Sequence, residues 1–356
     1  MSPASLNPNL DRFIVDYPVD DMTITVRADI TAAQLAAVLS QNRHQLPIDP
    51  LADQQTIRDL VDNDTAGPRQ YGRGTLRDYV IGIEAVDGHH RRFHAGGRVV
   101  KNVAGYDLCR LLIGARGQLG AVTQVTFKLS PLPPGSALLA ASFNNTQQLS
   151  AALDKLNISS TTPVILDVLN HIAATEICTE PPLSEFLPAL ANSPTAPTTH
   201  LFIGFEGPVE ACRWQLAAIT SELAATASHI HSFSAPDAFA RWCRISQQHA
   251  APAHGTPWLS QITLLPSRVS SAIDIASTQH CAAFGRAGNG VLWIRPAHNS
   301  STAEAAVLEP LRRLIPANSG SLLVLKGTNS YNTASTVPVS MLSTALQTAL
   351  AATAEN

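Results

Sequence analysis

A glycine-rich run between residues 96 and 123 constrains the fold of this chain more than any other part of its sequence. Gly114, Gly117 and Gly120 recur at every third position, between a predicted helix and a predicted strand. Glycines in such a loop let backbone N–H groups approach a ligand closely, as anions and flat cofactors require. A helix C-cap followed by a tight turn has the same spacing. The run therefore predicts either a ligand-binding loop or an ordinary helix end.

Several better-known motifs are absent from the sequence. The glycines do not form a G-x-G-x-x-G run that opens a helix, so a Rossmann dinucleotide site is unsupported. No G-x-x-x-x-G-K-[ST] phosphate loop occurs, and serine-hydrolase chemistry has no G-x-S-x-G anchor. The pairs His89-His90 and His229-Ile-His231 lack an evident third ligand. We therefore expect these histidines at the surface and no metal site.

Composition excludes several classes of protein. The 24 Lys and Arg residues are outnumbered by 27 Asp and Glu residues and form no run, which argues against a nucleic-acid partner. No window approaches the roughly 18 consecutive apolar residues of a membrane span, so no transmembrane segment is expected. The N-terminus lacks a signal-peptide pattern. The five cysteines are widely spaced without a C-x-x-C pair, which predicts no disulfide framework and no zinc or iron–sulfur site from this chain alone. We therefore expect a soluble, cytoplasmic protein.

The pattern of apolar residues predicts two domains separated by a proline-rich segment. Residues 130–136 contain three prolines and a glycine, which continue neither a helix nor a strand. Upstream elements are predicted as strands at 12–17, 22–27, 79–86, 91–94 and 122–129, a helix after Thr31, and a helix at 108–113. Downstream, strand–helix–strand units predict an α+β domain with helices on one face of an antiparallel sheet. These units comprise strands at 138–143, 164–169, 201–205, 258–264, 291–295 and 321–325, and helices at 147–156, 209–225 and 302–314.

The segment from Gly96 to Pro133 is distinctive enough to resemble a known family. The string Gly-Gly-Arg-Val-Val-Lys-Asn-Val-Ala-Gly-Tyr-Asp-Leu at 96–108, the glycine loop, and a strand ending Lys-Leu-Ser-Pro follow one another. This order closely resembles the FAD-binding domain of the vanillyl-alcohol-oxidase/PCMH flavoprotein superfamily. Within it, the best match is the FAD-binding subunit of glycolate oxidase. The resemblance includes Ala66-Gly-Pro-Arg69 and Leu76-Arg-Asp-Tyr-Val80, and extends weakly to residue 327.

The resemblance implies a fold and a function. The fold is α+β, with an N-terminally truncated PCMH-type FAD-binding domain at 10–133, an α+β cap domain with an antiparallel sheet at 137–327, and a polar tail at 328–356. The implied function is that of an FAD-dependent oxidoreductase subunit, in a glycolate oxidase-like complex that oxidises a small 2-hydroxy acid to a 2-oxo acid. The implied partners are a second flavin subunit and an iron–sulfur subunit. No catalytic residue can be named.

The residues expected to bind FAD lie in four short segments. They are Ala66, Gly67, Pro68 and Arg69; Arg77 and Asp78; Lys101 and Asn102; and Gly114, Gly117, Gly120, Ala121 and Val122. Arg69, Arg77 and Asp78 are expected to bind phosphate or ribose, or to form an ordinary surface pair instead. Lys101 and Asn102 are expected to contact the flavin or a partner subunit, or simply to form a polar turn.

Departures from the family's pattern leave a second function open. The family begins with a βα unit whose glycine loop holds the FAD diphosphate, and we expect this chain to start after that unit. Arg58 and Asp59 replace a Gly-Gly pair, and Asp64 replaces a small residue, so side chains obstruct the backbone and acids repel a diphosphate. Arg58 could instead pair with a phosphate. Residues 286–290 lack the histidines of related catalytic subunits. The alternative is a degenerate, non-catalytic assembly subunit that no longer binds FAD.

Overall fold

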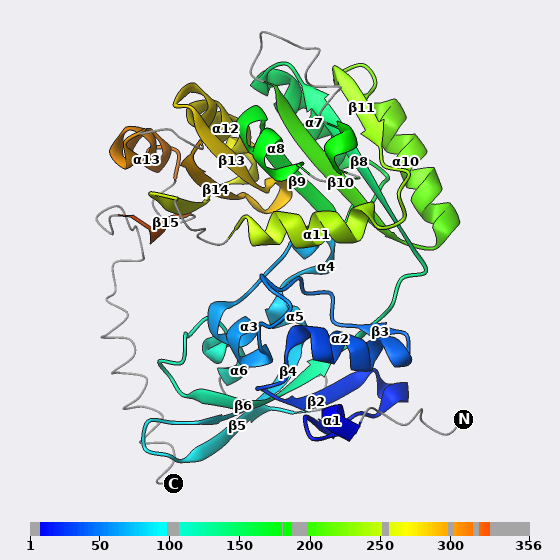
Figure 1. The fold of residues 1–356 in the computed structure, drawn as a ribbon, viewed down its shortest axis with the longest axis vertical. Coiled ribbons are helices and arrows are strands. Elements are labelled where there is room, and N and C mark those ends of the chain that lie inside the picture. The colour runs from blue at the N-terminus through cyan, green and yellow to red at the C-terminus, as the bar shows by residue number, and fades with distance from the viewer. Residues whose placement is uncertain are drawn as a thin grey trace. The chain divides into compact units, whose positions relative to one another are not determined.

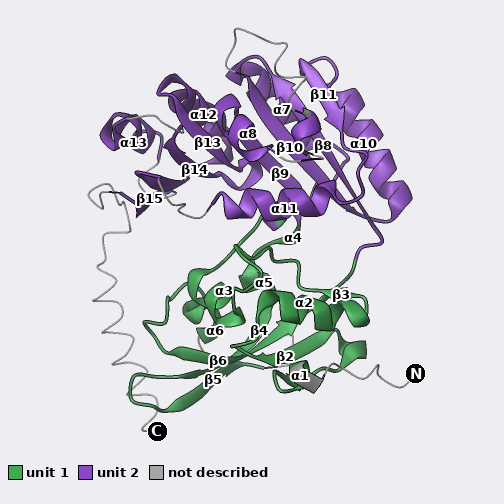
Figure 2. Ribbon diagram, in the orientation of Figure 1, with its two compact units in different colours: residues 1–69, 73–132, 337–356 green, residues 70–72, 133–336 purple. Residues whose placement is uncertain are grey.

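The computed structural model describes two compact units within the chain (Figure 2). The described residues are 8–97, 107–179, 181, 183–186, 198–250, 256–297, 302–315 and 320–327. The first unit contains the described residues up to Leu132 except 70–72, and the second contains residues 70–72 and the described residues from Pro133 onward. Lys101, Asn102 and the polar tail predicted at 328–356 lie outside the described residues.

The first unit is built on a five-stranded antiparallel sheet in the order β1-β2-β6-β4-β5 (Figure 1). Its strands are β1 (Ile14–Asp16), β2 (Thr23–Arg27), β4 (Val80–Val86), β5 (Arg92–Gly96) and β6 (Ala121–Lys128). Apolar side chains alternate along β6, where Val125 and Phe127 are fully buried. Between them, the Thr126 hydroxyl lies 2.9 Å from the hydroxyl of Thr25 on β2. This alternation follows the two-residue period of a half-buried strand, and the five predicted strands are confirmed.

Four helices contribute buried side chains to the core on this sheet, namely α2 (Ala32–Gln41), α3 (Ile57–Asn63), α5 (Leu76–Tyr79) and α6 (Leu108–Leu112). The remaining helical segments are α1 (Pro8–Asp11), η1 (Val19–Asp21) and α4 (Gln70–Arg73), and the chain passes from one unit to the other within α4. Thr31 caps α2 as predicted, because its side chain accepts the Gln34 N–H at 3.2 Å and Gln34 bonds back to the Thr31 N–H. Helix α3 was not predicted, and its N-terminus carries the same capping box from Thr56 and Asp59.

The proline-rich segment takes part in two strands, which corrects the prediction that residues 130–136 continue no element. Residues Ser130–Pro131 form β7, which pairs with β3 (His44–Gln45), and β8 begins at Gly135. Proline lacks a backbone N–H. It is tolerated in β7 because this strand belongs to a two-stranded sheet, in which each strand pairs on one side only.

The second unit contains an eight-stranded antiparallel sheet in the order β11-β8-β10-β9-β13-β14-β12-β15. The strands are β8 (Gly135–Phe143), β9 (Ile165–Asn170), β10 (Thr199–Gly207), β11 (His229–Ser232), β12 (Leu259–Thr263), β13 (Cys281–Arg286), β14 (Val291–Pro296) and β15 (Ser321–Lys326). The six strands predicted downstream of the boundary therefore belong to one sheet, together with β11 and β13. The predicted antiparallel α+β character of this region is confirmed.

Helices of the second unit cover both faces of the sheet, which corrects the prediction of one covered face. They are α7 (Thr146–Ile158), α8 (His171–Ile177), α10 (Val209–Leu223), α11 (Ala238–Gln248), α12 (Val269–Thr278) and α13 (Glu304–Arg312), with short turns η2 (Leu183–Phe186), η3 (Pro266–Arg268) and η4 (Ala287–Asn289). Helices α7, α10, α12 and α13 share one core with Leu201 and Ile203 of β10. Phe202 lies between Leu201 and Ile203 in the strand, so its side chain points to the opposite face of the sheet. There the ring of Trp242 of α11 stacks on it, with 3.8 Å between the ring centroids.

No helix among the described residues is long and apolar enough to cross a membrane. All five cysteines are buried free thiols.

Candidate functional site

The glycine loop predicted to bind a ligand connects α6 to β6 in the first unit. Gly114, Gly117 and Gly120 have φ angles of +84°, +71° and +153°. Residues with a Cβ rarely adopt these angles. At Gly120, an added Cβ would also lie 2.9 Å from the carbonyl oxygen of Val86. The path of the backbone therefore requires glycine here, independently of any ligand.

Backbone donors of this loop are engaged by α3. The Gly114 N–H donates to the carbonyl of Val61 at 2.8 Å, and the Arg116 N–H donates to the carbonyl of Asp62 at 3.0 Å. Each backbone N–H is a single donor. These two amides therefore already donate to carbonyls at the C-terminal end of α3, a helix that was not predicted from the sequence.

Two carboxylates from the same helix end also contact the loop and a nearby cation. The Asp62 carboxylate lies beside Gly117, where an added Cβ would be 3.9 Å from Asp62 Oδ2. Asp64, the C-cap of α3, pairs with Arg77 through an Nε–Oδ2 distance of 3.1 Å. Burial raises the pKa of Asp62 above its ordinary value, while the positive charge of Arg58 acts in the opposite direction. Negative charge thus already lies beside the loop.

The predicted residues Arg77 and Asp78 have structural partners. The Arg77 Nη2 donates to the Ile113 carbonyl at 3.2 Å, in addition to the Asp64 pair. The Asp78 carboxylate accepts the Thr75 N–H at 2.7 Å and the Thr75 hydroxyl at 3.2 Å, which caps α5. Arg77 thus forms an Arg–Asp pair with Asp64, whereas Asp78 caps a helix, and the two predicted residues do not pair with each other.

The predicted segment 66–69 lies around Asp49. The Arg69 Nη2 is 2.7 Å from Asp49 Oδ1, and the two side chains are only 14% and 8% exposed. The Arg69 N–H donates to the second oxygen of Asp49 at 3.2 Å, and Nη1 donates to Gln45 at 2.9 Å. A Cβ on Gly67 would overlap the Asp49 side chain, which explains the glycine at this position. Beside them, Pro68 is buried.

A pocket of about 370 Å³ borders the Asp49–Arg69 pair. Its apolar wall is formed by α2, including Leu35 and Leu39, and its polar wall includes Asp49, Arg69 and Gln45. The volume is within the range of small-molecule sites, which begins near ~300 Å³. The guanidinium in its wall is already neutralised by the adjacent carboxylate.

These contacts do not fit a diphosphate at the glycine loop. The amides that point from Gly114 and Arg116 have partners, and the two carboxylates beside the loop would repel an anion. Ala121 and Val122 begin β6, and the Val122 carbonyl accepts the Arg58 Nε–H at 2.9 Å. Arg58 is therefore engaged as well. The loop and residues 66–69 form two separate clusters of contacts within the first unit.

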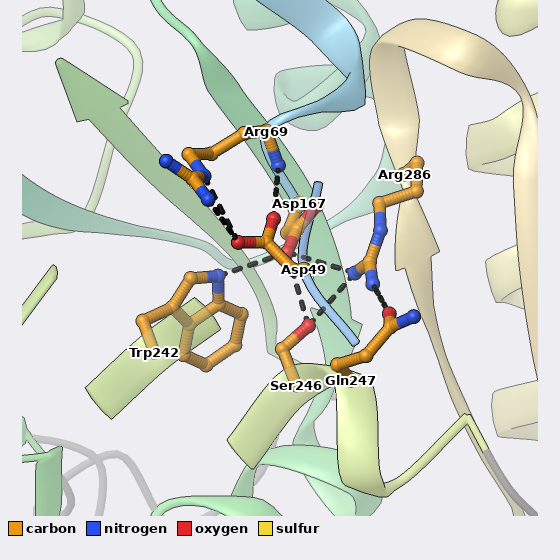
Figure 3. A network of polar contacts seen from close by, with 7 residues as sticks. All are labelled: Asp49, Arg69, Asp167, Trp242, Ser246, Gln247 and Arg286. Atoms are coloured by element: carbon orange, nitrogen blue, oxygen red, sulfur yellow. Dashed lines mark hydrogen bonds and ion pairs between the residues drawn. The ribbon is translucent and has the colours of Figure 1, made fainter. Parts of the chain in front are cut away.

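A buried polar network in the second unit was not predicted from the sequence (Figure 3). Asp167 Oδ2 on β9 accepts the Trp242 Nε1–H at 2.8 Å and the Ser246 hydroxyl at 3.2 Å, both from α11. It also pairs with Arg286 Nη1 on β13 at 3.0 Å, and both charged side chains are 1% exposed. Arg286 Nη2 donates to Gln247 at 2.9 Å.

The network holds a carboxylate with an unusual pKa. Burial raises the pKa of Asp167 to about 6, against the opposing effects of Arg286, Trp242 and Ser246. The available sequence signal was a single acid inside the otherwise apolar strand 164–169. Within the described ranges, no group of three or more His, Cys, Asp or Glu side chains is arranged to hold a metal ion.

Comparison with known proteins shows relatives among FAD-linked oxidoreductases. No family model matches the chain. It is similar to the glycolate oxidase subunit GlcE of Escherichia coli, with 33% identity over 148 residues, which are 41% of this chain and 42% of that protein. The predicted resemblance is confirmed.

Two further relatives act on small 2-hydroxy acids by their names. The glycolate oxidase subunit GlcD of Bacillus subtilis is 30% identical over 159 residues, which are 44% of this chain and 34% of GlcD. The D-lactate dehydrogenase of Archaeoglobus fulgidus is 30% identical over 129 residues, 36% of this chain and 29% of that enzyme. In each of the three cases, the match spans less than half of the relative's length.

Solved structures share the fold over most of the chain. An alkyldihydroxyacetonephosphate synthase superposes with a TM-score of 0.66 over 85% of this chain and 60% of its own, at 16% identity. p-Cresol methylhydroxylase superposes with a TM-score of 0.60 over 84% of this chain and 68% of its own, at 15% identity. The predicted α+β fold of the PCMH type is therefore confirmed.

Proposed function

We propose that this chain is a subunit of a glycolate oxidase-like, FAD-linked oxidoreductase complex that oxidises small 2-hydroxy acids to 2-oxo acids. The observation that carries the proposal is the 33% identity to glycolate oxidase subunit GlcE, joined with a PCMH-type fold. GlcD and a D-lactate dehydrogenase among the relatives support a 2-hydroxy acid as the substrate class. The partners are a second flavin subunit and an iron–sulfur subunit, and the complex is cytoplasmic.

The complex-level function is tested by purification from the native cells. The tagged chain should bring down a complex that contains flavin and iron and that reduces a dye when glycolate or D-lactate is added. Cells without the chain should lose this activity and regain it from a plasmid copy. Unchanged glycolate oxidation in cells without the chain would contradict the proposal.

FAD is the cofactor of the proposed complex, and the resemblance assigns one FAD to this chain through residues 66–69, 77–78, 101–102, 114, 117 and 120–122. A second candidate is an assembly subunit that carries no flavin. The observation that favours it is the engagement of the Gly114 and Arg116 amides by α3. The visible absorption spectrum of the purified chain separates the two candidates. Flavin bands, with FAD released on denaturation and lost in Gly117→Asp, support flavin binding at the loop; a folded, colourless chain supports the second candidate.

A further inference from the structure

We infer that the carboxylates of Asp62 and Asp64 occupy the anion-binding side of the glycine loop, so that α3 supplies a built-in substitute for a diphosphate. The inference rests on the proposed function only in that the FAD diphosphate is the anion the loop would otherwise be expected to take. It concerns residues of the first unit alone.

The groups around the loop are those that bind anions in proteins. The Asp62 carboxylate lies beside Gly117, where an added Cβ would be 3.9 Å from Oδ2, and the positive charge of Arg58 lowers the pKa of the same carboxylate. The Arg77 guanidinium lies 3.1 Å from Asp64 Oδ2. Backbone donors in a left-handed turn, together with two guanidinium groups, are a typical setting for phosphate oxygens. Here, Arg77 pairs with the Asp64 carboxylate, Asp62 lies beside Gly117, and the Arg58 Nε–H donates to the Val122 carbonyl.

The two carboxylates are held at a cost, which is unusual for ordinary helix-end residues. Asp62 Oδ1 and Asp64 Oδ1 are both buried without a hydrogen-bond partner. Buried polar atoms in native proteins nearly always have partners, so each exception points to a constraint beyond local capping. Asp64 also adopts φ = 47°, a left-handed conformation that glycine takes more readily. An aspartate kept in a glycine-like conformation beside Arg77 is consistent with a role for its charge.

The packing at Gly114 leaves no room for a second anion while Asp64 is present. A Cβ built on Gly114 would lie 3.3 Å from Asp64 Cβ and 3.8 Å from Arg77 Nη2. The Asp64 side chain therefore fills the space directly beside the loop backbone. Removal of both carboxylates would leave a space beside Gly117 and Arg77, close enough to Arg58 for its charge to act there.

The inference is tested by chemical rescue with inorganic pyrophosphate. The double variant Asp62→Ala/Asp64→Ala should melt below the wild-type chain, and pyrophosphate should raise its unfolding midpoint by several degrees in a saturable manner. The wild-type midpoint should not respond to pyrophosphate beyond the effect of sodium chloride at matched ionic strength. Asp59→Ala is the matched control, because it removes a charge from the same helix but bonds to Thr56 rather than to the loop.

A second double variant covers the case in which the double alanine variant does not fold. Asp62→Asn/Asp64→Asn keeps the size of both side chains and removes their charge, and it should also gain saturable pyrophosphate binding by calorimetry. The inference is overturned if the wild-type chain binds pyrophosphate as tightly as the variants, if it holds FAD that Gly117→Asp displaces, or if neither variant gains binding. These outcomes are independent of glycolate oxidation by the complex, so failure of the proposed function is recognised separately.

Discussion

Replacement of Arg286 with methionine tests how the buried network of the second unit is balanced. The guanidinium pairs with Asp167 at 3.0 Å, donates to Ser246 at 2.7 Å and lies 5.2 Å from the centre of the Trp293 ring. Methionine retains much of the apolar packing, but the Asp167 carboxylate then keeps only neutral partners. Removal of one partner from a buried ion pair costs about 3–5 kcal/mol. We therefore expect a loss of this size in the free energy of unfolding at pH 8.

The size of this loss should depend on pH in a defined direction. The pKa of Asp167 is about 6 with Arg286 present, above the ordinary value of 3.8. Between these two values the folded chain holds more protons at Asp167 than the unfolded chain, so this group's contribution to stability falls as the pH rises through that window. The guanidinium lowers this pKa, so its removal raises the pKa further. A protonated carboxyl needs no counter-ion, and the deficit of Arg286→Met should therefore be smaller at pH 5 than at pH 8.

Urea unfolding followed by tryptophan fluorescence reports on the second unit, because all four tryptophans lie in it. Arg213→Met is the matched control. Its pair with Glu210 spans 2.7 Å, but the side chains are 71% and 81% exposed. Loss of an exposed pair should cost at most ~1 kcal/mol, equally at both pH values. The reasoning is refuted if Arg286→Met loses no more than Arg213→Met, or if its deficit is the same at pH 5 and pH 8.

Two further predictions concern a helix cap and an aromatic stack. Thr56→Ala removes the oxygen that accepts the Asp59 N–H at 3.2 Å, and it should cost about 1 kcal/mol in the first unit by hydrogen exchange, whereas Thr56→Ser should retain most of this stability. Phe202→Ala removes a fully buried ring that stacks on Trp242 at 3.8 Å. It should cost about 3–5 kcal/mol and change the tryptophan emission of the folded chain, and an unchanged spectrum would argue against the stack.

The sheet of the first unit could be predicted because its signals are local. Alternation along β6 and the cap at Thr31 depend on residues close together in sequence, and both appear where expected. Helix α3 was missed although Ile57, Leu60 and Val61 have helical spacing and Thr56 with Asp59 forms a capping box. The sequence analysis considered Arg58 and Asp59 only as side chains that would obstruct a diphosphate, although both signals of a helix were present.

The network of the second unit depends on information that a local pattern does not contain. Asp167 and Arg286 are 119 residues apart in the sequence, and they meet because β9 and β13 are neighbours in register. Helix α11 was not predicted, and an amphipathic pattern would not show the sheet face on which the helix packs. Placement of Trp242 over Phe202 follows only once the order of all eight strands is known.

The glycine loop shows that the backbone conformation required by a glycine pattern and the binding of an anion are separate properties. Positive φ angles at Gly114 and Gly117 are needed for the passage from α6 into β6, and the same glycines serve whether the loop amides meet a phosphate or α3. The spacing of glycines thus reports the conformation of the backbone, and the residues opposite the loop determine which group it binds. In this chain those residues are Asp62 and Asp64. The C-terminal end of α3 therefore determines whether the loop can hold a diphosphate. With Asp62 and Asp64 in place the anion site is filled by carboxylates, and without these two side chains it would be open to an anion.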